Sequence, residues 1–170
     1  MGSEKNLVAA PTQLADRYIG DLKVDKDLLL EFFIMFSRFE YALKRTDYVR
    51  KGVNWVAPDW PKFAKHIKAK FEETKIVKAV EYLKSKPPQI QMVKNKKFVF
   101  EKSPNCGSGV VYLIKCVKIV RNNLFHGGKF PSGPVDDPAR NRDLIQYSLE
   151  FLHYMLTLDE EVEVAFKEHN

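Results

Sequence analysis

An arginine and a histidine lie five positions apart near the end of an apolar segment of this chain of 170 residues. The segment reads VRNNLFHGG over residues 120–128, so Arg121 is followed directly by Asn122 and then by His126. A guanidinium can hold two phosphate oxygens at once, and an imidazole can transfer a proton near neutral pH. These residue types favour phosphodiester chemistry without a metal. The simpler interpretation is a pair of cations that complements the negative end of a helix dipole.

The spacing also decides how these side chains are arranged around a helix. Residues five apart are separated by about 140° around the axis, whereas Asn122 and His126 are four apart and share a face. In RNA cleavage without a metal, His126 would act as general base or acid, and Arg121 would stabilise the charged phosphorane. One imidazole does not readily serve both proton transfers. The chemistry therefore predicts a homodimer in which two copies of the motif meet.

Helices are predicted to position these residues, because apolar side chains recur every three or four positions along much of the chain. The three long helices are predicted over residues 25–46, 108–126 and 138–157. Shorter helices are predicted over 60–70, 72–86 and 159–168, the first of them beginning with an Asp59 cap before Trp60-Pro61. Residues 89–102 are ambiguous between a short strand and an extended packing segment. The fold class is thus predicted to be all-α, an up-and-down helical bundle.

The net charge of +6 is concentrated in the middle of the chain. Residues 51–102 hold 13 lysines and 5 acidic residues, a difference of +8. The first 50 residues are balanced, and residues 103–170 carry a difference of −2. Such a basic block would attract a polyanion through phosphate contacts without sequence preference. The alternative is a lysine-rich face that only keeps the protein in solution.

Cysteine and histidine spacing gives no sign of a metal site. Two cysteines, Cys106 and Cys116, are too few for a disulfide framework or a four-cysteine zinc site, and Cys116 is expected to be a buried apolar residue. No histidine pair has the HExxH spacing of zinc enzymes. Among the lysines of its helix, His66 is expected to be solvated, whereas His153 is expected to pack inside the bundle. We therefore expect no metal and no cofactor.

No segment is predicted to enter a membrane. The longest apolar run, residues 32–36, is far too short to span a bilayer. The N-terminal sequence MGSEKNLVAA lacks the apolar stretch of a secretion signal. Low cysteine content fits a reducing compartment, so a cytoplasmic location is expected.

Two segments of the chain resemble HEPN domains, which are small all-α ribonucleases of toxin and antiviral systems. The Arg-Asn-x3-His pattern at 121–126 is similar to the Arg-x4-His signature of that family. The segment FSRFEYALK, residues 36–44, resembles the family's first-helix segment, in which an acidic residue points toward the Arg–His helix. Glu40 would then orient Arg121 or His126; the alternative is an ordinary pair with Lys44, four residues on. The resemblance covers residues 25–50 and 108–157.

The resemblance implies a single HEPN-like domain over residues 1–170. In it, residues 51–105 would form a basic helical insertion between the first helix and the motif helix, and residues 1–20 and 159–170 would be peripheral. It also implies a metal-independent endoribonuclease that uses the 2′-hydroxyl to leave cyclic phosphate ends. The expected catalytic residues are Arg121, His126, Asn122 and Glu40. The expected substrate-binding residues are Lys44, Arg38, Asn123 and Lys129.

The same resemblance suggests partners and leaves alternatives open. RNA would be the substrate, the protein would be a homodimer, and an antitoxin or regulatory protein would control it in toxin–antitoxin or phage defence. The first alternative is a HEPN-like module without catalysis that binds RNA, a nucleotide or a protein, because fold alone does not settle activity. The second is a purely structural bundle with an incidental Arg–His pair.

Overall fold

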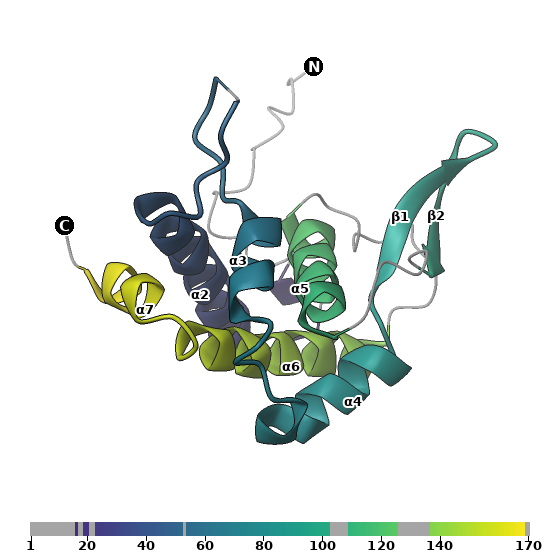
Figure 1. Ribbon diagram of the computed structural model, residues 1–170. Helices are drawn as coiled ribbons and strands as arrows, with labels where there is room; N and C mark the ends of the chain where they lie inside the picture. Colours follow the sequence, from purple (N-terminus) through teal and green to yellow (C-terminus); the bar gives the residue numbers. More distant parts are fainter. Residues whose placement is uncertain are drawn as a thin grey trace, which may run out of the picture.

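Helices make up most of the structure, a computed structural model that describes residues 16, 19–20, 23–52, 54–102, 109–125 and 137–168. Its helices are α2 (Lys26–Arg45), α3 (Trp60–Ile67), α4 (Val77–Ser85), α5 (Gly109–Phe125), α6 (Pro138–Leu156) and α7 (Glu160–Lys167), with a 3₁₀ turn, η1 (Glu73–Ile76), before α4. Two strands, β1 (Gln89–Lys94) and β2 (Lys97–Lys102), extend from one side of the helical body (Figure 1). The three long predicted helices are confirmed as α2, α5 and α6.

Aspartate caps determine where four of these helices begin. In each case the carboxylate accepts a hydrogen bond from the backbone N–H three residues further on, at 2.9–3.1 Å. The capping residues are Asp25, Asp59, Asp137 and Asp159. Such a cap is worth roughly 1 kcal/mol, because it satisfies one of the free N–H groups of the first turn. The predicted helix start at Asp59 is confirmed.

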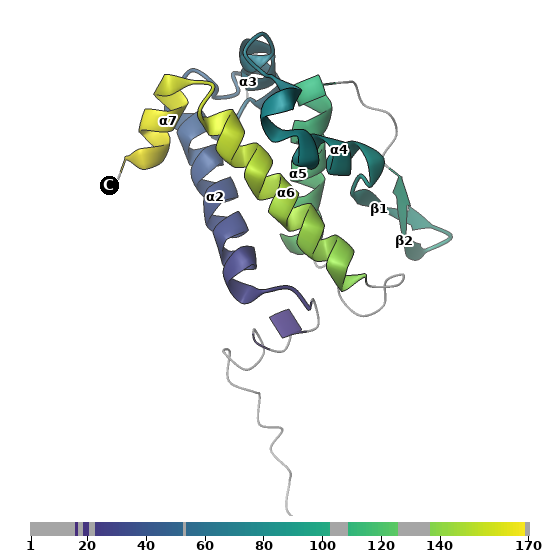
Figure 2. The same cartoon turned by 90° about the horizontal axis from the view of Figure 1, so that it is seen from below.

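The core is organised around α6, which contacts α2, α4, α5 and α7. Figure 2 shows α2 beside α6, with the two helices close together near α7 and further apart at their other ends. The segment predicted as a basic insertion, 51–105, contributes to this core, because Phe63 and Ile67 of α3 and Leu83 of α4 are fully buried. Cys116 is buried in α5, as expected. Within the described ranges, no helix is both long enough and apolar enough to cross a bilayer.

Stacked aromatic rings join α3 to α2. Trp60, only 3% exposed, stacks on Phe39 with ring centroids 5.4 Å apart and an angle of 10° between the planes. The same indole lies 5.7 Å from Phe36, and Phe63 packs edge-on against Phe39 at 5.5 Å. Aromatic pairs of this kind add about 0.5–1.5 kcal/mol to the burial of their area. Trp60 thus anchors α3 on α2, whereas Trp55 is exposed.

Residues 89–102, which the sequence left ambiguous, form an antiparallel β-hairpin, called the hairpin below. Its register pairs Lys94 with Lys97 across the two-residue turn Asn95-Lys96. Both turn residues have positive φ, 49° and 61°, as a type I′ turn requires. The all-α prediction is thus correct for the helical body and wrong for this segment, since aromatic and β-branched residues favour extended backbone.

The turn gives a testable prediction, because Lys96 occupies a position that favours glycine. A side chain in the left-handed region costs roughly 1–2 kcal/mol, which replacement by glycine would remove. The greater freedom of glycine in the unfolded chain offsets part of this stabilisation. We expect Lys96→Gly to raise the free energy of unfolding by about 0.5–1 kcal/mol in urea denaturation. The matched control, Lys97→Gly in β2, should lower it by a similar amount. A destabilised Lys96→Gly would contradict the turn geometry.

Candidate functional site

Arg121 lies in the last turns of α5 and is held against α2 by aromatic rings. Its Cζ is 5.6 Å from the centroid of the Phe36 ring and 5.2 Å from that of Phe125. Its Nη1 donates a hydrogen bond to Oδ1 of the adjacent Asn122 at 3.1 Å. A guanidinium has five N–H donors, so one bond to Asn122 leaves donors with which to bind a phosphate. The cation is therefore oriented by its neighbours and still able to hold an anion.

Glu40 lies on α2 one turn after Phe36, on the face that Arg121 covers. Its Oε1 accepts a hydrogen bond from Nε1 of the buried Trp60 at 3.2 Å. Its charge also acts on Lys118 of α5. The carboxylate therefore faces α5, the helix that carries the motif, and its orientation is set by the indole of α3. That Glu40 orients Arg121 or His126 stays a prediction, since the hydrogen bond described for its carboxylate comes from Trp60.

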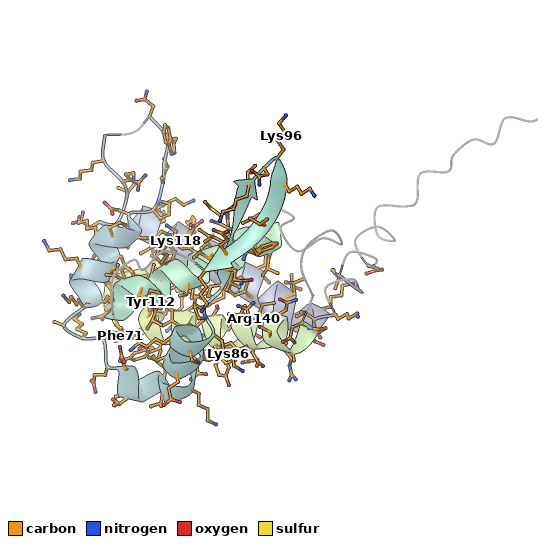
Figure 3. The ribbon with its side chains drawn as sticks, turned by 90° about the vertical axis from the view of Figure 1, so that its right-hand side faces the viewer. Phe71, Lys86, Lys96, Tyr112, Lys118 and Arg140 are labelled. Atoms are coloured by element: carbon orange, nitrogen blue, oxygen red, sulfur yellow. The ribbon has the colours of Figure 1, made fainter. Side chains whose placement is uncertain are left out.

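Lys118 is a half-buried cation that the sequence analysis did not single out. Burial lowers the pKa of its ammonium below the usual 10.5, Glu40 opposes that shift, and Arg50 and Arg121 add to it. One carboxylate and two other cations therefore act on Lys118. The sequence could have indicated this residue, because Lys118 and Arg121 are three positions apart on α5 and therefore lie on one side of it. Lys118 is labelled on α5 in Figure 3.

A groove of about 310 Å³ lies between α3 and α5 beside these charges. Its walls are apolar on both sides, and its polar groups come from α5. The lining residues are Trp60, Pro61, Ala64, Val111, Ile114, Lys115, Lys118, Ile119 and Asn122. Its volume is at the lower end of the range of ligand pockets, roughly 300–1,000 Å³. This α3–α5 groove offers an apolar floor and cationic and amide groups at its edge, which suits a base with its attached phosphate.

Two of the predicted substrate-binding residues have structural contacts elsewhere. Asn123 is buried, and its Nδ2 donates to the backbone oxygen of Gln89 at 2.8 Å. Arg38 donates from Nη2 to the backbone oxygens of Phe166 and Glu168, both at 2.6 Å, at the end of α7. These contacts tie the hairpin to α5 and α7 to α2.

The remaining predicted residues are Lys44, His126 and Lys129. Lys44 is half-buried in the last turn of α2. His126 and Lys129 lie outside the described residues, since α5 is described to Phe125. From the predicted catalytic set, Arg121 and Asn122 are hydrogen-bonded to each other, and Glu40 and Arg121 both act on Lys118.

Among the described residues, the two histidines lie on α3 and α6. His153 was expected inside the bundle, but this prediction is wrong: its side chain is 57% exposed and its Nε2 is 3.6 Å from a carboxylate oxygen of Glu31. His66 is half-exposed, and its Nε2 is 3.4 Å from Oδ2 of the buried Asp159. That same Oδ2 accepts a hydrogen bond from the Tyr48 hydroxyl at 2.5 Å. Burial, and then the bond to Asp159, raise the pKa of Tyr48, so the phenol stays protonated and fixes the α7 cap.

The charges around Lys118 predict a measurable pKa change. Glu40 favours the protonated ammonium, so Glu40→Gln should lower the pKa of Lys118 further below its usual value. The measurement is a pH titration of the Lys118 Cε resonance by heteronuclear NMR. Glu31→Gln, an exposed glutamate on the same helix, is the matched control and should leave that pKa unchanged. An unchanged Lys118 pKa in Glu40→Gln would show that the carboxylate does not act on this cation.

Comparison with known proteins adds no independent assignment to this geometry. The chain matches no protein-family model, no curated protein and no solved structure. Any assignment of function therefore depends on the residues of α2, α3 and α5 themselves.

Proposed function

We propose that this chain is a metal-independent endoribonuclease of the HEPN type, acting on RNA at the end of α5. The observation that carries the proposal is the charge gathered between α2 and α5: Arg121 packs on Phe36, and one turn along α2 Glu40 acts on Lys118. The acidic residue thus faces the helix of the Arg-x4-His pattern, which supports the resemblance on which the assignment rests.

Arg121 and Lys118 would hold the scissile phosphate in this site. Two cations at one phosphate stabilise the extra negative charge that develops on the phosphorane, and partial burial strengthens the interaction. Glu40 has a different role, because a carboxylate next to a phosphate repels it. Hydrogen-bonded to Trp60, it balances the two cations and fixes their positions before substrate binds. Asn122 orients the Arg121 guanidinium through its side-chain oxygen.

His126 would carry out the proton transfer. As a base it removes the proton of the 2′-hydroxyl, the 2′-oxygen forms a bond to phosphorus, and the bond from phosphorus to the 5′-oxygen breaks. A protonated group then gives its proton to the leaving 5′-oxygen, so the products are a 2′,3′-cyclic phosphate and a 5′-hydroxyl. A second His126 from a two-fold partner would serve as that acid, so the reaction requires a homodimer. A cytoplasmic role in toxin–antitoxin or phage defence under a regulatory protein is part of the proposal.

A binding module without catalysis is the second candidate. The observation that favours it is the exposed hairpin, whose lysines can hold an RNA backbone without any reacting group. Mutation of the proton-transfer residue distinguishes the two functions.

The test of the proposal is cleavage of a mixed RNA in excess EDTA, with analysis of the product ends. We expect 2′,3′-cyclic phosphate and 5′-hydroxyl ends. Cleavage should fall about 10²–10⁴-fold in His126→Ala, because a general acid or base is lost. In Arg121→Ala it should fall about 10²–10³-fold, because transition-state charge is no longer stabilised.

The matched control is His153→Ala, which removes an exposed imidazole on α6 and should leave cleavage unchanged. Circular dichroism of each variant checks that the helices are retained. RNA binding without cleavage, or cleavage equal in His126→Ala and the unmodified protein, would refute the nuclease and favour the binding module.

A further inference from the structure

The hairpin projects away from the helical body and presents its outer half to solvent. Figures 1 and 3 show it extending beyond α5, with Lys96 at its tip. Every residue from 91 to 97 is exposed. A two-stranded ribbon that only completed a core would instead bury one of its faces.

The charge of the hairpin is strongly positive and increases toward its tip. It holds four lysines and one glutamate, a net charge of +3. Lys94 forms an ion pair with Glu101, so the net charge is carried by Lys96 and Lys97 at the turn and by Lys102 near the root. These cations are the type of group that contacts phosphates without reading sequence.

Lys96 also lies where local geometry favours another residue. Its φ of 61° is in the left-handed region, and a type I′ turn favours glycine at this second position. The chain thus carries a cation at the tip in spite of the turn chemistry. Conflicts between local preference and observed residue are typical of functional positions.

Two side-chain contacts fix the root of the hairpin to α5, the helix that carries Arg121, and to α6. Asn123, two residues after Arg121, donates to the Gln89 carbonyl at 2.8 Å. Arg140 of α6 donates from Nη2 to the Pro87 carbonyl at 2.8 Å. The hairpin therefore begins beside the C-terminal turns of α5 and extends from there, as Figure 3 shows for Arg140 near its root.

We infer that the hairpin is an RNA-backbone-binding arm, which holds phosphates of the strand whose scissile group lies at Arg121. The inference rests on the proposed function for its ligand, RNA, and adds an element outside the expected catalytic set. RNA is inferred as the ligand because its negatively charged phosphates complement the exposed lysines of the tip, which carries few other polar groups. The arm contributes affinity and the direction of the strand, while α5 contributes the chemistry.

The test measures how RNA binding depends on salt, since each phosphate contact adds to that dependence. The probe is a fluorescein-labelled, single-stranded RNA of about 20 nucleotides with 2′-O-methyl groups, which lacks the attacking hydroxyl, in about 50–200 mM salt. Each contact to a single strand contributes about 0.7 to the slope of log K against log salt. Lys96→Gln with Lys97→Gln should therefore reduce the slope by about 1.4.

A matched control separates the arm from general charge. Lys65→Gln with Lys68→Gln removes the same charge from exposed positions at the end of α3 and should leave the slope unchanged. Lys96→Gly adds a second readout, because it removes the cation while favouring the turn. It should reduce the slope by about 0.7 without lowering the unfolding midpoint.

Equal slopes for the arm variant and the unmodified protein, or an equal loss in the α3 control, would overturn the inference. So would the failure of the unmodified protein to bind this RNA at low salt, which would leave an acidic protein surface as the ligand of the arm. Cleavage in EDTA tests the proposed function separately. A slope that depends on the arm without any cleavage would refute only the nuclease, and cleavage with an unaffected slope would refute only the arm.

Discussion

The contact between Trp60 and α2 is the interaction on which the rest of the site depends. One face of the indole stacks on Phe39, and its N–H donates to Glu40. The same side chain therefore fixes the distance between α2 and α3 and orients the only carboxylate among the described charges that act on Lys118. Loss of a buried tryptophan generally costs about 3–5 kcal/mol. Here it would also remove a wall of the α3–α5 groove and leave Glu40 without this donor.

That contact explains how cations are kept close together in a partly buried place. Like charges oppose one another, and burial opposes each of them. The body of the fold supplies two compensations: the Glu40 carboxylate and the aromatic faces under Arg121. Both belong to helices whose buried faces are packed in the core. Preorganisation of this kind favours binding of an anion over binding of a neutral group.

The sequence predicts the helices well, because their signals are local. Apolar spacing and aspartate caps can be read within one segment, which is why α2, α3 and α6 begin where they were expected. The hairpin was harder to predict, since its turn has lysine where glycine would have marked it. The candidate site shows a similar limit. Glu40 is singled out by a family resemblance and its role stays a prediction, whereas Lys118 becomes a candidate only once its neighbours on other helices are known.

The surroundings of three side chains differ from what the sequence indicated, for a common physical reason. Arg38 and Asn123 have the right chemistry for a phosphate, but their hydrogen bonds go to backbone carbonyls 128 and 34 positions away. His153 lies between apolar neighbours in sequence, yet one position on a helix turns the side chain by about 100°, here into solvent. Contacts between residues so far apart in the sequence cannot be predicted from the spacing of residues within one segment.

The two root contacts of the hairpin have a consequence for protein engineering. The direction of the hairpin relative to the helices is set by its contacts with Asn123 of α5 and Arg140 of α6 and not by the strands themselves. A graft of residues 89–102 onto another helical scaffold would therefore transfer the strands but not their direction relative to the helices. A transplanted hairpin would keep its direction only if the two anchoring side chains were transferred with it. The residues that form the hairpin and the residues that orient it thus lie in different parts of the sequence.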